Sequence, residues 1–137
     1  MKKVLVLALV VVGGLVIGSP RLADYFANKA FKEKNREKEW APGLAYRGGV
    51  FHMHLYNFGK ANTIFKKALD QWDDFEKRPD CMYKTASSYK HLGKTGKALK
   101  WYKRYKNHYP DHRWYSEAKK NISQLNANLE VSEEVAR

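Results

Sequence analysis

The chain between Met82 and Pro110 reads MYKTASSYKHLGKTGKALKWYKRYKNHYP. Apolar residues recur at helical spacing on both sides of a short turn that contains Gly93, and Pro110 ends the second run. A glycine just past a helical run is typical of a helix C-terminus, and a proline beyond it cannot continue the helix. The stretch therefore predicts a helical hairpin whose apolar face needs a neighbour.

Similar patterns extend this prediction over residues 44–126. Helices are expected at 45–56, 60–77, 81–92, 96–108 and 112–126. Asn57-Phe58-Gly59 is the first expected turn, Arg78-Pro79-Asp80 is expected to stop the second helix, and Asp111 can cap the last. No alternating apolar run of strand type is present. With 44% hydrophobic and 14% aromatic residues, the chain can form a packed core, and the predicted fold class is all-α.

A short motif occurs twice in the predicted helices. Gly59-Lys60-Ala61 and Gly96-Lys97-Ala98 lie 37 residues apart, and an aromatic residue follows each at the same distance, Phe65 and Tyr102. The pattern resembles the tetratricopeptide repeat (TPR), a helix-turn-helix unit of about 34 residues. The resemblance covers about residues 44–126. It implies two hairpins, a capping helix and a function in binding other proteins. The junction at Tyr109-Pro110-Asp111 is also similar to junctions in bacterial envelope proteins of this class.

The resemblance also implies a binding groove, because the first helix of each TPR hairpin lines a concave surface that holds a partner segment. The residues expected to line it are Tyr46, Val50, Met53, His54, Tyr83, Ser87, Lys90 and His91. The alternative is that some of these residues are simply exposed surface. Only Lys90 could take part in a carboxylate clamp of the kind known in this repeat class, so that clamp is not expected.

The formal net charge of +12 favours an acidic partner. A basic face is predicted in the second hairpin, formed by Lys94, Lys97, Lys100, Lys103, Arg104 and Lys106. The aromatic residues between them recur at helical spacing, so they are expected in the core rather than as stacking platforms for bases. Lysine outnumbers arginine, which suits diffuse attraction better than bidentate recognition of phosphate. An acidic protein surface is the expected partner, anionic lipid is a further candidate, and nucleic-acid binding is the alternative.

The N-terminus predicts a membrane anchor over residues 1–20. Lys2 and Lys3 precede an uncharged run from Val4 to Pro20, which is longer than most signal-peptide cores and just long enough for a spanning helix. Gly14 and Gly18 have the small-xxx-small spacing that lets two membrane helices pack closely. The alternative is a cleaved signal, which would release a periplasmic TPR adaptor.

Residues 21–43 are expected to form an amphipathic to charged helical linker, ending at the break Trp40-Ala41-Pro42-Gly43. This linker either stands in solvent or lies on anionic lipid. Positive charge on both flanks of residues 4–20 leaves the orientation open, but long folded domains are translocated regardless of charge. The domain is therefore expected in the periplasm, on the bacterial inner membrane. Residues 127–137 are expected to be a frayed tail.

Enzymatic chemistry is not indicated by the sequence. The histidines lack zinc-site spacing, and no glycine-rich phosphate loop follows a strand. Cys81 is the only cysteine, and no neighbouring base is evident that could activate it. We expect no metal, no cofactor and no small-molecule substrate. The expected function is a membrane-anchored interaction scaffold or an accessory subunit of a membrane or envelope complex.

Overall fold

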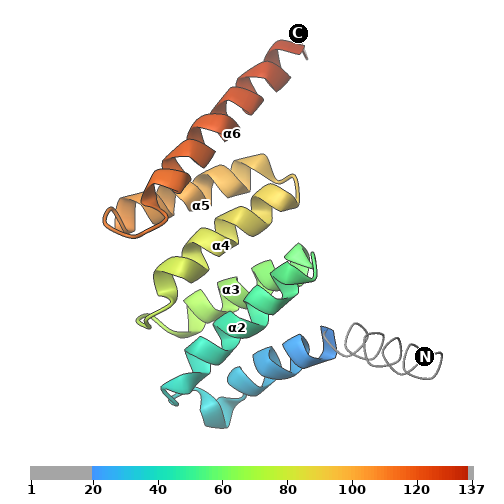
Figure 1. Ribbon diagram of the computed structural model, residues 1–137, viewed down its shortest axis with the longest axis vertical. Coiled ribbons are helices and arrows are strands. Elements are labelled where there is room, and N and C mark those ends of the chain that lie inside the picture. The colour runs from blue at the N-terminus through green and yellow to red at the C-terminus, as the bar shows by residue number, and fades with distance from the viewer. Residues whose placement is uncertain (1–19, 136–137) are drawn as a thin grey trace, which may run out of the picture.

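The computed structural model describes residues 20–135, whose regular structure is helical without a strand (Figure 1). The all-α class is thus confirmed. The elements are the helical segment 20–30, the 3-10 turn η1 (Glu33–Asn35), α2 (Trp40–His54), α3 (Phe58–Gln71), α4 (Arg78–His91), α5 (Thr95–His108) and α6 (Tyr115–Val135). From α2 to α6, each helix packs on the next, so the helices form an elongated stack.

The expected membrane anchor, including Gly14 and Gly18, lies outside the described residues. Within residues 20–135, none of the helices combines the length and apolar character needed to cross a bilayer.

Two hairpins, α2–α3 and α4–α5, turn in the same way. Tyr56 and Gly93 occupy equivalent places just past α2 and α4, with φ of 57° and 68°. The matching backbone bonds run from Tyr56 N to Met53 O and Asn57 N to His52 O, and from Gly93 N to Lys90 O and Lys94 N to Tyr89 O. Both turns are Schellman motifs, which satisfy the last carbonyls of a helix. The backbone of the two turns therefore repeats with the same 37-residue spacing as the sequence motif.

The boundaries of α3 and α4 differ from those expected. Asn57 caps α3 rather than following in a turn, because its side-chain oxygen accepts a hydrogen bond from Lys60 N (3.4 Å). The helix α3 then ends at Gln71, well before residue 77. Its terminal carbonyls need partners, and the Arg78 guanidinium donates to the carbonyl of Leu69 (3.0 Å).

The helix α4 starts three residues earlier than expected, at Arg78. Pro79 lies in its first turn, where a missing N–H costs no intrahelical hydrogen bond. Asp80 is therefore inside the helix rather than in the segment that stops the preceding one.

The segment 20–30 packs against α2 instead of standing apart as a linker. A Cβ atom on Gly48 would lie 3.1 Å from the backbone of both Ala23 and Ala27, so only glycine allows this approach comfortably. Asp24 adds polar ties: it accepts from His52 Nε2 (3.0 Å) in α2 and from Lys60 Nζ (2.8 Å) in α3. The hydrogen bond and charge of Lys60, with His52, lower the pKa of Asp24 despite partial burial.

Residues 31–39 form turns rather than the expected charged helix. The Phe31 ring stacks on Trp72, the residue that follows α3, at 5.5 Å, and Trp72 Nε1 donates to the carbonyl of Arg36 (2.8 Å). The expected break at Trp40 is instead the start of α2, with Pro42 in its first turn. The N-terminal region 20–39 is therefore part of the helical stack.

The helix α6 continues to Val135, past the end expected near residue 126. Ala118, Asn121 and Leu125 are buried against the stack, whereas Val131 and Val135 are 60% and 83% exposed. The second half of α6 projects beyond α5 (Figure 1). No glycine or proline interrupts residues 115–135, so the helix has no local reason to stop where its packing ends.

Asp80 ties the start of α4 to the loop before α6. Its buried carboxylate accepts from Arg113 Nη2 (2.5 Å) and from Trp114 Nε1 (3.0 Å). Burial alone would raise the pKa of Asp80, but these hydrogen bonds and the charges of Arg113 and His112 outweigh burial and lower it. The ionised carboxylate therefore stabilises the folded state.

Packing at Gly49 yields the first prediction. A Cβ atom there would lie 2.4 Å from Phe65 Cε1, and Phe65 is fully buried. For Gly49→Ala, we expect overpacking of about 1–3 kcal/mol to outweigh the gain in helix propensity, so that urea unfolding shows a net loss of stability. In this background Phe65→Leu should restore part of the loss.

The matched control is Gly96→Ala in α5, because no atom lies within 4 Å of its Cβ position. This variant should be neutral or more stable. Equal destabilisation by both alanines would contradict the account of α2–α3 packing.

Asp80 yields the second prediction. Because its folded pKa is lowered, its stabilisation is present above the unfolded value of about 3.9 and is lost as pH falls through the folded pKa. Asp80→Asn should lower the free energy of unfolding by about 1–2 kcal/mol at pH 7 and by little at the acid end of the range. Urea unfolding at several pH values measures this difference. A cost that stays constant across this range would rule out the ionised carboxylate as its source.

Candidate functional site

Three of the four α2 residues of the predicted groove, Tyr46, Val50 and His54, line an apolar surface groove of about 390 Å³. Its lining residues are Leu22, Phe26, Tyr46, Arg47, Val50, Phe51 and His54. Burial raises the pKa of Tyr46 to about 12, so its hydroxyl stays neutral. Leu22 and Phe26, four residues apart on the segment 20–30, form the other wall. Met53 does not line this groove but packs half-buried against the core.

The α4 residues of the predicted groove lie elsewhere, and two of them contact the loop before α6 and α6 itself. The Tyr83 ring stacks on Trp114 with centroids 5.2 Å apart, and Lys90 Nζ donates to Asn121 Oδ1 (2.5 Å). Ser87 is half-buried, and the exposed His91 ring stacks on Phe58 at 4.2 Å. The eight predicted residues therefore do not line one groove: Tyr46, Val50 and His54 share a groove, while the other five lie elsewhere.

Half of the predicted basic face meets a lysine of the first hairpin around a hollow of about 370 Å³. We call this site the basic hollow; its lining residues are Lys66, Tyr89, Lys97, Lys100, Trp101 and Arg104. It therefore has four cationic side chains and no carboxylate in its lining. Lys94 and Lys103 are exposed and Lys106 is half-buried, but none of the three lines it.

Helix geometry explains why these side chains converge. Lys97, Lys100 and Arg104 follow one another by three and four residues, which places them on one face of α5. The other face is buried through Ala98 and Tyr102. The helices α3 and α5 both pack on α4, so Lys66 of α3 reaches the same hollow, and Tyr89 of α4 forms part of its lining.

The two aromatic rings of the basic hollow have cations over their faces. The Arg104 guanidinium lies 5.2 Å from the Trp101 ring centroid, and Lys97 Nζ lies 5.9 Å from the Tyr89 centroid. Such contacts attract the cation to the ring and hold both in place. Tyr89 is also only 7% exposed. These rings offer little free surface for stacking bases, and the charged side chains in the lining are all cationic.

Lys66 was not among the predicted basic residues. The predicted face was chosen from the high density of lysines in the second hairpin, whereas residues of both hairpins line the hollow.

Cys81 is fully buried at the start of α4. Burial, with a smaller effect of the Asp80 charge, raises the pKa of its thiol well above the usual value. Since the thiolate is the reactive form, nucleophilic chemistry at Cys81 is disfavoured. Between residues 20 and 135, no three His, Cys, Asp or Glu side chains are grouped so that they could hold a metal ion.

No known protein family, curated protein or solved structure matches this chain.

Proposed function

We propose that this chain is a membrane-anchored, TPR-like interaction scaffold, or an accessory subunit of a membrane or envelope complex, that binds an acidic segment of a partner protein. The observation that supports it best is the basic hollow, where Lys66, Lys97, Lys100 and Arg104 converge without a carboxylate in the lining. Each cation would be neutralised by a partner carboxylate, and opposite charge steers and orients association.

The form of the domain also favours a scaffold. Two hairpins related by 37 residues stack through consecutive helices, and such repeats typically present an extended surface to a partner. The side formed by α3 and α5 carries the basic hollow, while α6 packs on α5 at the end of the stack.

An acidic protein is favoured over nucleic acid by the state of the aromatic rings. Tyr102 and Tyr105 are buried, and cations lie over the rings of Tyr89 and Trp101. Binding of single strands relies on bases stacked on free aromatic faces, which this surface does not supply. The setting at the membrane rests on the uncharged run Val4–Pro20, and the periplasmic face of a bacterial inner membrane is the location proposed for the domain.

The third prediction tests the basic hollow with a defined probe, a fluorescent helical peptide that carries glutamates at i and i+4. We expect Lys97→Glu combined with Arg104→Glu to weaken binding at least about tenfold, because two attractions become repulsions. Fluorescence anisotropy at two salt concentrations measures the affinity and its electrostatic share.

The control is Lys119→Glu combined with Lys120→Glu, which changes the net charge equally at two exposed positions of α6. It should bind the peptide nearly as well as the unaltered chain. If both pairs of substitutions weakened peptide binding equally, net charge alone would explain the binding and the basic hollow would not be the site. Tighter binding of an oligothymidine strand than of the peptide, with a steep salt dependence, would favour the nucleic-acid alternative instead.

A further inference from the structure

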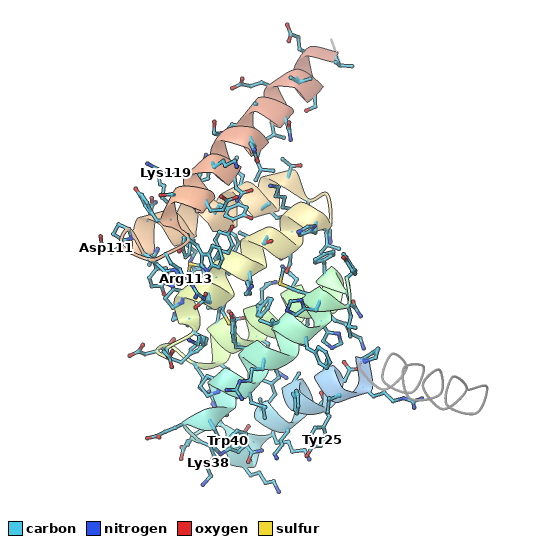
Figure 2. The ribbon with its side chains drawn as sticks, viewed as in Figure 1. Tyr25, Lys38, Trp40, Asp111, Arg113 and Lys119 are labelled. Atoms are coloured by element: carbon cyan, nitrogen blue, oxygen red, sulfur yellow. The ribbon has the colours of Figure 1, made fainter. Side chains whose placement is uncertain are left out.

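A second cationic surface lies apart from the basic hollow, where the segment 20–30 leads into the turns of residues 31–39. Lys29 Nζ lies 5.8 Å from the ring centroid of Tyr25 and 5.8 Å from that of Trp40. These two rings are 55% and 45% exposed. Figure 2 shows Tyr25, Lys38 and Trp40 at the same end of the molecule, opposite the projecting end of α6. One lysine thus lies between two large aromatic rings that face solvent.

Lysines converge beside these rings around a hollow of about 270 Å³. We call it the lysine hollow; its lining residues are Tyr25, Asn28, Lys29, Lys32, Lys34 and Asn35. Asn35 is buried, and its side-chain amide donates to the carbonyl of Lys29 (2.7 Å). This bond closes the turn from residue 29 to residue 35. The turn in this way brings Lys29, Lys32 and Lys34 to the lining of one hollow.

The glutamates of the same turns do not line the lysine hollow. Glu33 faces Arg36 across an exposed ion pair of 3.9 Å. Glu37 and Glu39 are exposed, and neither contributes to the lining. Although lysines and glutamates alternate in the sequence, the hollow beside Tyr25 is therefore lined by Lys32 and Lys34 and by none of the glutamates.

Half-exposed tyrosine and tryptophan together with lysine are the side chains that proteins place at the headgroup level of a bilayer. Leu22, which is 46% exposed, adds apolar surface at the same segment. The uncharged run Val4–Pro20 ends next to Leu22 in the sequence, so a bilayer that holds this run lies within a few residues of this surface.

We infer that this surface docks on an anionic phospholipid bilayer. The phosphate of a headgroup occupies the lysine hollow, and the rings of Tyr25 and Trp40 lie among the headgroups on either side of Lys29. This goes beyond binding of an acidic partner, because it sets which side of the domain faces the membrane and leaves the basic hollow to the partner.

The fourth prediction is tested with the full chain in vesicles of brominated phosphatidylcholine, with and without phosphatidylglycerol. The contribution of Trp40 to bromine quenching is the difference between the unaltered chain and Trp40→Phe. We expect this contribution to be at least about twofold larger with phosphatidylglycerol, since juxtamembrane lysines are attracted to anionic lipid. Lys32→Glu combined with Lys34→Glu should abolish the increase, and Lys119→Glu combined with Lys120→Glu should keep it.

Equal quenching in the two kinds of vesicle would overturn the inference, as would an unchanged increase in the Lys32→Glu, Lys34→Glu chain. Inorganic phosphate at matched ionic strength separates a lipid site from a free-phosphate site. If phosphate alone, in zwitterionic vesicles, changed the Trp40 contribution as much as phosphatidylglycerol does, the lysine hollow would bind the free ion and the lipid assignment would fail.

Discussion

The close approach of α2 to neighbours on two sides is the constraint on which the rest of the structure depends. Gly49 leaves room for the Phe65 ring of α3, and Gly48 leaves room for the backbone of Ala23 and Ala27. Larger residues at either place would separate these elements. Asp24 could then no longer reach both His52 and Lys60. The hydrogen bonds of the N-terminal segment therefore depend on the close approach that the two glycines allow.

Small buried residues also allow close packing further along the stack, and this packing positions the candidate sites. Ala61, Ala68 and Ala98 are fully buried, which lets α3, α4 and α5 pack closely enough for Lys66 to join the cations of α5. Asp80 ties α4 to the loop before α6, and α6 then packs beside Tyr83. The two cationic hollows therefore lie on separate parts of the molecule, one between α3 and α5 and one at the turn after residue 30.

Local signals in the sequence predicted the helical class and the hairpins, because glycine, proline and apolar spacing act over a few residues. They did not predict the parts of the fold that long-range contacts determine. Residues 21–43 look like a charged linker, yet Ala23 and Ala27 pack on Gly48, a contact that no local pattern reveals.

For the candidate sites, the sequence indicated a basic surface on the second hairpin but not the set of residues that line the hollow. Three of the six predicted basic residues, Lys97, Lys100 and Arg104, line the basic hollow, and Lys66 joins them only through the stacking of the hairpins. Tyr83 and Lys90 were expected in an open groove, but their partners, Trp114 before α6 and Asn121 in α6, come from a chain segment more than 20 residues away.

The central claim is that the basic hollow holds an acidic segment of a partner at a membrane. A photo-crosslinking residue at Lys100, compared with one at Lys120, tests it in the native membrane. We predict that the intact chain stays with the membrane fraction and that position 100 crosslinks a glutamate- or aspartate-rich segment of another protein, while position 120 does not. Recovery of a soluble, uncrosslinked chain that begins near Ser19 would contradict both the anchor and the subunit assignment.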